Sequence, residues 1–223
     1  MIDQNLVARF QPYRPTNSSF ISFEGIEGSG KTTQIQKLKS SLEAQGLKVT
    51  LMREPGGTAF GEKMREAILT SEEKISPVAE ACLMAASRAQ LLEQRIIPLL
   101  EKRDNIVIVD RYLDSSLAYQ GSARGLGAQN VLEIHNRHPL TIVPSLTFYL
   151  KIDLETSMRR QDHRGSKKDY FEKENSLFYS KLIEGYDEAC SIFPERFQVI
   201  DGKRTQEEVS ADILDSAQKL IKG

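Results

Sequence analysis

The chain of 223 residues contains no tryptophan, only two cysteines and only three histidines. Cys82 and Cys190 are far apart and form no CxxC or Cys/His spacing. This pattern favours two reduced, buried thiols over a disulfide or a structural metal site. His135, His138 and His163 do not form a ligand set either. We therefore expect no metal of the protein's own beyond one that a substrate brings.

Long apolar runs and a large net charge are also lacking. No apolar run approaches the roughly 20 residues of a membrane helix, and the first residues lack the pattern of a secretory signal. The formal net charge is −1, which indicates no bulk attraction to nucleic acid or to an anionic membrane. With 39% hydrophobic and 27% charged residues, the composition is typical of a globular protein. We expect a cytoplasmic protein with no membrane or nucleic-acid partner.

Segments of strand and helix character alternate along the chain. Residues 20–23 and 47–52 have strand character, and residues 32–45 place apolar side chains on one helix face. Residues 106–109 form an uninterrupted apolar run, which is typical of parallel strands buried on both faces. The alternation predicts an α/β fold with a mostly parallel sheet. Further elements are expected at 77–102 (a helix with a bend at Pro98), 146–150 and 197–200.

The domain organisation is predicted to be simple. Residues 1–18 show no periodic apolar pattern and contain Pro12 and Pro15. We interpret them as a flexible N-terminal extension before one domain at 19–223. The stretch from 159 to 170 is rich in charge and poor in apolar residues, which indicates a surface loop.

The strongest motif is the stretch GIEGSGKT at residues 25–32, which matches GxxxxGK(S/T) directly after a predicted strand. Glycines let the backbone wrap closely around phosphates, and the N–H groups of the loop and the following helix attract oxygen anions. Lys31 can reach the β- and γ-phosphates of ATP, and the Thr32 hydroxyl can hold Mg²⁺. The predicted nucleotide-binding residues are Gly25, Ile26, Glu27, Gly28, Ser29, Gly30, Lys31, Thr32 and Thr33.

Asp110 follows the apolar run 106–109. Parallel α/β sheets bind ligands at the carboxyl ends of their strands, and an aspartate there can contact the Mg²⁺ coordination shell. A strand that ends in aspartate is common by itself. Combined with the phosphate loop, it predicts a Mg²⁺ site at Thr32 and Asp110.

Several classes of P-loop protein are disfavoured. The guanine-reading motif (N/T)KxD of GTPases and the LSGGQ-like signature of ABC ATPases are absent from the sequence, and the chain is short for a motor. A nucleoside or nucleotide kinase remains.

Four segments then narrow the kinase class. FEGIEGSGKTTQ (23–34), REPGGT (53–58), AASRAQ (85–90) and DRYLDSSLAYQG (110–121) have the order and spacing found in bacterial thymidylate kinases. From residue 20 to its end the chain resembles this family. The resemblance implies a three-layer P-loop NTPase fold with a small lid at about 159–172. It also implies ATP and Mg²⁺ as cofactors, phosphorylation of dTMP to dTDP in dTTP biosynthesis, and a homodimer.

The resemblance also assigns roles in the acceptor site. Arg111 would bind the acceptor phosphate, and Arg88 would contact O4 of thymine. Ser116 and Gln120 would meet the polar edge of the base, Gln120 at N3, and Tyr119 would pack under the sugar. For Ser115, Ser116 and Gln120 the alternative is capping of a helix N-terminus. The predicted substrate-binding residues are Glu54, Arg65, Met84, Arg88, Arg111, Ser115, Ser116, Tyr119 and Gln120.

Two departures from the family pattern affect these roles. Met84 stands where the family usually has a phenylalanine that stacks on thymine, and Tyr170 replaces an arginine near the end of the lid. Since the phosphate loop carries no arginine, the lid would supply the cation, with Arg160 and Arg164 as the candidates. Lys167 or Lys168 would substitute for the arginine that Tyr170 replaces. Glu27 would lie at the donor–acceptor junction. The predicted catalytic residues are Glu27, Lys31, Arg111, Arg160 and Arg164.

No general base is expected, because the second pKa of a phosphate monoester is about 6 and its oxygens are already ionised at neutral pH. Positioning and charge stabilisation should then carry catalysis. Two alternatives stay open: a kinase for another monophosphate such as dUMP, because of Met84, and a nucleotide-binding regulator without turnover. Intact Lys31, Thr32, Asp110 and Arg111 argue against the second.

Overall fold

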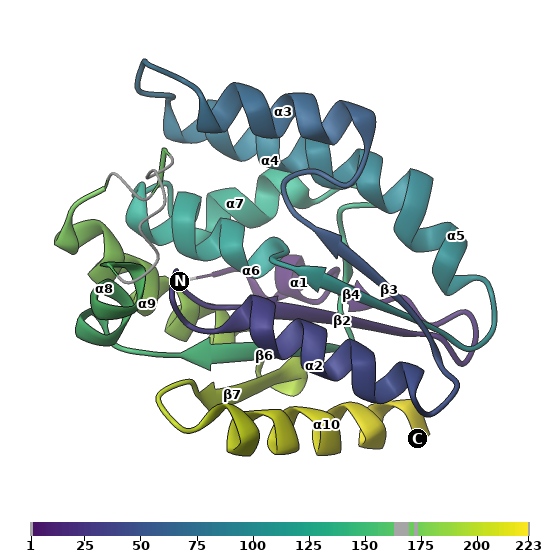
Figure 1. Ribbon diagram of the computed structural model, residues 1–223. Helices are drawn as coiled ribbons and strands as arrows, with labels where there is room; N and C mark the ends of the chain where they lie inside the picture. Colours follow the sequence, from purple (N-terminus) through teal and green to yellow (C-terminus); the bar gives the residue numbers. More distant parts are fainter. Residues whose placement is uncertain (1, 163–169, 172–173, 223) are drawn as a thin grey trace.

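A computed structural model describes residues 2–162, 170–171 and 174–222 (Figure 1). Its centre is a five-stranded sheet in the order β3-β4-β2-β6-β7, in which all neighbouring strands are parallel. The predicted α/β fold with a parallel central sheet is therefore confirmed. The strands are β2 (Ser19–Glu24), β3 (Lys48–Arg53), β4 (Asn105–Asp110), β6 (Leu146–Lys151) and β7 (Phe197–Asp201).

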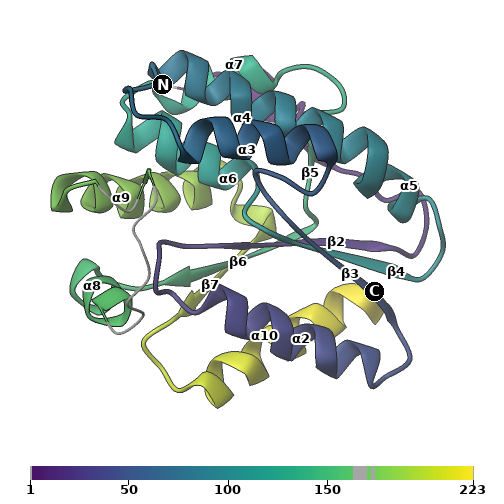
Figure 2. The same ribbon diagram turned by 45° about the horizontal axis from the view of Figure 1, so that its top comes forward.

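Helices cover both faces of this sheet and create three layers (Figures 1 and 2). On one face, α2 (Lys31–Glu43) and α10 (Gln206–Lys222) pack on the side chains that β2 and β4 direct toward them, Ile21, Phe23 and Ile108 among them. On the other face lie α4 (Pro77–Leu91), α5 (Ile97–Leu100), α6 (Leu113–Ser116), α7 (Ala128–His135) and α9 (Ser176–Ile192).

The register of β2 and β4 positions the site. All six residues of β2 are buried, the polar Ser19, Ser22 and Glu24 included, because the strand lies in the middle of the sheet with helices on both faces. Phe23, near the carboxyl end of β2, is paired with Asp110, the last residue of β4. The phosphate loop, which follows β2, therefore begins next to Asp110.

The long helix predicted at 77–102 is interrupted. After α4 the chain makes a π-helical turn over Leu92–Ile96 before α5 begins. The break precedes Pro98, whose missing N–H cannot donate to the preceding turn. A second π-helical segment, Leu117–Ala123, follows α6 and carries Tyr119 and Gln120.

The N-terminal residues differ from the loose extension that the sequence predicted. They form α1 (Gln4–Val7) and β1 (Gln11–Pro12), and β1 pairs with β5 (Ile142–Val143). Leu6 and Phe10 are buried in the core beneath α7 and α9. Ile2, Leu6 and Phe10 are spaced four residues apart, but this run of three is too short to predict the packing. The domain boundary at residue 18 stays a prediction.

Two smaller observations complete the fold. Both cysteines are free, as predicted, but Cys82 is exposed on α4 and Cys190 is only partly buried, so the prediction of two buried thiols is wrong. None of the described helices has the length and apolar character needed to cross a membrane. The remaining helices are α3 (Ala59–Leu69) and α8 (Leu154–Asp162).

Candidate active site

The phosphate loop joins β2 to α2 and is shaped by glycines with positive φ. Gly25, Gly28 and Gly30 have φ values of 137°, 78° and 97°. A Cβ atom on Gly25 would lie 2.6 Å from the carbonyl oxygen of Leu150, so the loop can follow this path only with glycine there. The Nζ atom of Lys31 donates to the carbonyl oxygens of Gly25 (2.7 Å) and Ile26 (3.2 Å), within the curve of the loop.

The charge of Lys31 is balanced by its surroundings. Burial lowers the pKa of Lys31 to about 8, and the nearby Arg111 acts in the same direction, whereas Asp110, Glu27 and Glu24 oppose the shift. The lysine is thus a buried cation held among acidic groups at the point where phosphates are predicted to bind.

Thr32 and Asp110 fit a magnesium ion. Thr32 lies in the first turn of α2, and Asp110 lies at the carboxyl end of β4. The Oδ1 atom of Asp110 is buried, and no hydrogen-bond partner for it is found in the part of the chain that the structure describes. A buried carboxylate oxygen without a donor, together with a hydroxyl group, is the hard oxygen chemistry that Mg²⁺ prefers.

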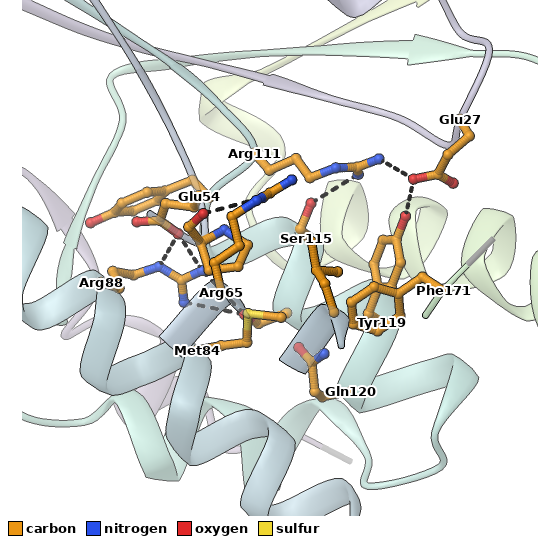
Figure 3. A pocket seen from close by; sticks show the side chains of 14 residues that line it. Glu27, Glu54, Arg65, Met84, Arg88, Arg111, Ser115, Tyr119, Gln120 and Phe171 are labelled. Carbon is orange, nitrogen blue, oxygen red and sulfur yellow. Dashed lines mark hydrogen bonds and ion pairs between the residues drawn. The ribbon is translucent and has the colours of Figure 1, made fainter. Parts of the chain in front are cut away.

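A cavity extends from the phosphate loop to α4 (Figure 3), and every predicted substrate-binding residue lines it. Glu27 lies at the loop end of this cavity, in agreement with a position at the junction of two ligands. Arg53, the last residue of β3, pairs with Glu62 on α3 (3.1 Å). The wall also contains residues that the sequence analysis did not assign, namely Pro55, Leu69, Tyr112 and Phe171.

Arg111 links the cavity to the phosphate loop. Its guanidinium donates to the carboxylate of Glu27 (2.6 Å), the carbonyl of Gly25 (3.0 Å) and the hydroxyl of Tyr186 (2.9 Å). Its backbone has a φ of 72°, rare for a non-glycine residue, and its N–H donates to the carbonyl of Phe23. Burial by itself would raise the pKa of Glu27, but Arg111 and Lys31 outweigh it, and the carboxyl pKa is lowered.

Arg88 is held at the other end of the cavity by several buried partners. Its Nε atom donates to Glu54 Oε2 (2.7 Å), and both terminal nitrogens lie 3.2 Å from the hydroxyl of Ser116. The Nε2 atom of His135 lies 2.6 Å from Nη1 of Arg88, and its Nδ1 atom lies 2.8 Å from the carbonyl of Val131. His135 must therefore be neutral, with its proton on Nδ1.

Electrostatics supports this state of His135, because burial and the adjacent Arg88 lower its pKa to about 3. From the sequence, His135 was considered only as a possible metal ligand, and its contact with Arg88 was not predicted. The two residues are 47 positions apart, and no local motif signals the contact.

The polar residues after Asp110 do not cap a helix. The residue that precedes α6 is Tyr112, and no side chain provides a capping hydrogen bond there. Instead, the Ser115 hydroxyl donates to Glu24 Oε2 (2.6 Å), and Gln120 Nε2 donates to Glu80 Oε1 (2.7 Å). The hydroxyl of Tyr119 donates to Glu27 Oε1 (2.8 Å).

The lid is described only in part. The guanidinium of Arg160 bridges the carbonyl oxygens of Gly28 and Gly202, at 3.0 Å from each. Arg164, Lys167 and Lys168 lie outside the described residues. The hydroxyl of Tyr170 accepts a hydrogen bond from the N–H of Ile75 (3.3 Å), between α3 and α4.

A second cavity lies on the outer side of the phosphate loop, beside Arg160. It reaches from Gly30 and Thr33 to the connection between β7 and α10, which contributes Gly202 and Arg204. Gly202 and Arg204 were not predicted as site residues from the sequence. They are distant from the loop in sequence and belong to no motif.

The comparison with known proteins agrees with this geometry. A family model described as thymidylate kinase matches residues 23–213. The chain belongs to the thymidylate kinase family. The resemblance inferred from the four sequence segments is thereby confirmed.

Curated thymidylate kinases resemble the chain over nearly its whole length. The protein of Thermoanaerobacter sp. (strain X514) is 45% identical over 202 residues, which cover 91% of this chain and 98% of that protein. The protein of Bacillus velezensis is 42% identical over 205 residues, which cover 91% of this chain and 96% of that protein. The protein of Hahella chejuensis is also 42% identical over 205 residues, which cover 92% of this chain and 98% of that protein. The family match thus extends through the phosphate loop, the cavity and α8.

Proposed function

We propose that the protein transfers the γ-phosphoryl group of ATP to dTMP, yielding dTDP and ADP, with Mg²⁺ as the metal. The observation that carries this proposal is the continuity of one cavity from Glu27 and Arg111, at the phosphate loop, to the buried Arg88 and Gln120. Such a cavity suits an acceptor with a phosphate at one end and a polar base at the other. The relatives' name supports thymidylate as that acceptor.

The base end of the cavity offers polar contacts of defined direction. Arg88 is a donor held by Glu54 and Ser116, and we assign it to O4 of the base. Gln120 is assigned to N3. Tyr119, whose hydroxyl is fixed by Glu27, is assigned to the sugar, where its ring would crowd a 2′-hydroxyl.

The phosphate end provides positive charge where two anions meet. Arg111 is assigned to the acceptor phosphate because a guanidinium can hold a phosphate with two parallel hydrogen bonds. Lys31 and the loop N–H groups are assigned to the β- and γ-phosphates of ATP. Bound Mg²⁺, held through Thr32 and Asp110, would neutralise phosphate charge. Arg160, beside the loop, is the described candidate for the lid cation.

The proposed reaction needs positioning rather than a base. The acceptor oxygen attacks the γ-phosphorus, the bond to the β–γ bridging oxygen breaks, and ADP leaves with that oxygen. Arg111 would orient the nucleophile, and Lys31 would stabilise charge on the transferred group. The donor's nucleoside is assigned to the second cavity, next to Arg160 and Arg204.

The test is a monophosphate panel. Purified protein with ATP and Mg²⁺ is mixed in turn with dTMP, dUMP, dCMP, AMP and GMP, and ADP release is followed. We expect strong turnover with dTMP, and a Lys31→Ala variant should abolish it, which excludes a contaminating kinase. Better turnover with dUMP would overturn the acceptor assignment. ATP binding without turnover of any monophosphate would favour a regulatory protein.

The homodimer remains a prediction from the family resemblance, and the cytoplasmic location remains a prediction from the sequence pattern. Light scattering coupled to size-exclusion chromatography tests the first, and a species near twice the mass of the 25.1 kDa chain is expected. A monomer with full activity would contradict it.

A further inference from the structure

Glu80 is a buried carboxylate that lies behind the acceptor cavity. It is in the first turn of α4, is 0% exposed and is not part of the cavity wall. Each of its oxygens has one donor: Oε1 accepts from Gln120 Nε2 (2.7 Å), and Oε2 accepts from Arg124 Nε (3.2 Å). In the part of the chain that the structure describes, Glu80 reaches the cavity wall through its hydrogen bond with the side chain of Gln120.

This contact determines which way the amide of Gln120 faces. An ionised carboxylate accepts hydrogen bonds and cannot donate them, so the NH₂ group of Gln120 must face Glu80. The carbonyl oxygen is then left for the cavity (Figure 3). Within residues 2–162, 170–171 and 174–222, Gln120 Oε1 accepts no hydrogen bond.

Arg124 helps to keep Glu80 in the ionised form. Burial raises the pKa of the Glu80 carboxyl, whereas the hydrogen bond from Gln120 and the charge of Arg124 oppose that rise. Arg124 also pairs with Glu174 and packs 4.8 Å from the ring centre of Phe178. The arginine is thus fixed from several sides and holds the carboxylate in place.

The orientation of the Gln120 amide decides which bases can form a hydrogen bond with it through N3. Thymine and uracil carry a hydrogen on N3, whereas N3 of cytosine carries a lone pair and accepts. We propose that Glu80 is a positioning residue: by holding the Gln120 carbonyl toward the cavity, it makes the site accept bases that donate from N3 and reject cytosine. This inference rests on the proposed function, which places the base against Gln120.

Glu80→Gln tests the inference. A glutamine at 80 both donates and accepts, so Gln120 can turn and present its NH₂ group to the N3 atom of cytosine. We expect the ratio of kcat/KM for dTMP to that for dCMP to fall by about 30-fold. The ratio for dTMP to dUMP should not change, because both bases donate from N3. A general distortion of the pocket would not separate these two ratios, and neither depends on the fraction of folded enzyme.

Glu174→Gln is the matched control. It makes the same chemical change in the other carboxylate bound to Arg124 but leaves Glu80 and Gln120 intact, so both ratios should stay at the wild-type values. The exchanged variant Glu80→Gln/Gln120→Glu supplies a second route if the single variant is inactive. In this double variant the amide NH₂ group at position 80 can donate to the carboxylate at position 120. The second carboxylate oxygen at position 120 then faces the base as an acceptor, so the rejection of dCMP should return.

The outcomes separate this inference from the proposed function. Absence of dTMP turnover by the wild type overturns the proposed function. Turnover of dTMP with an unchanged dTMP/dCMP ratio in Glu80→Gln overturns the role of Glu80 alone. A parallel fall of both ratios, or poor rejection of dCMP by the exchanged variant, would also contradict it.

Discussion

The phosphate loop and the acceptor cavity are built in different ways. The loop consists of consecutive residues, and its shape depends on glycines at Gly25, Gly28 and Gly30. The cavity uses side chains from distant segments, such as Glu54 after β3 and Arg88 on α4, which are joined by buried ion pairs and hydrogen bonds. One region is defined by backbone, the other by side-chain contacts.

This difference predicts different sensitivities to mutation. A loop that binds through N–H groups is damaged when its backbone must move, even by one methyl group. A cavity held by buried charges is damaged when a partner is removed, because the remaining charge has lost its counterion. Substitutions in the loop and in the cavity should therefore differ in the size and the kind of their effect.

Gly25→Ala should cause the largest loss. Its Cβ atom would lie 2.6 Å from the Leu150 carbonyl oxygen, at a φ of 137°. We expect kcat/KM for ATP to fall by about 10³-fold or more, since the loop must move away from the phosphates. Steady-state kinetics measures this fall.

The control for this variant is Gly46→Ala. Gly46 also has a positive φ, 83°, but no atom lies within 4 Å of an added Cβ. It should cost about 1–2 kcal/mol of stability and leave kcat/KM unchanged. If the Gly25→Ala enzyme kept its activity, ATP use would not depend on the backbone path that glycine allows at this position.

Arg88→Met tests the cavity. Glu54 would keep its buried position without its cation, so we expect the free energy of unfolding to fall by about 3–5 kcal/mol, measured by urea denaturation. Removing the carboxylate as well, in Arg88→Met/Glu54→Met, should recover part of this loss.

Lys219→Met is the control for Arg88→Met. Lys219 pairs with Asp215 on α10, with side chains 76% and 61% exposed, and its replacement should cost less than about 1 kcal/mol. If Arg88→Met cost no more than this exposed pair, burial would not be what holds the cavity together.

The same difference explains what the sequence could predict. The phosphate loop is a contiguous motif, and β4 is a contiguous apolar run, so both were found directly. The cavity residues were found only through the family resemblance. Partners behind the wall were missed: His135 and Glu80 contact Arg88 and Gln120 at separations of 47 and 40 residues. Such contacts arise from tertiary packing and leave no local pattern.

The pH dependence of ATP use tests the electrostatics of the loop. The pKa of Lys31 is lowered to about 8, so its positive charge is present below that pH and lost above it. We expect kcat/KM for ATP, which reports on the free enzyme, to fall toward a tenfold decrease per pH unit above pH 8. A pH series at constant ionic strength measures this.

Lys31→Arg sharpens the pH test. A guanidinium stays charged throughout this range, so the variant should show a flat profile from pH 7 to 9.5, at lower overall activity because its shape differs from that of an ammonium. A wild-type profile that stays flat to pH 9.5 would show that the buried lysine keeps its proton.

Met84→Phe should have the smallest effect, and it is a gain. Met84 is partly buried in the cavity wall, at the position where the family usually has a phenylalanine that stacks on thymine. Aromatic stacking contributes about 0.5–1.5 kcal/mol beyond burial, so KM for dTMP should fall by about two- to tenfold, with kcat and KM for ATP unchanged. Met158→Phe, at a residue 53% exposed on α8, should change none of these values. A rise in KM for dTMP in Met84→Phe would mean that the cavity is already filled by its own side chains, Phe171 among them, and that the methionine is needed to leave room for the base.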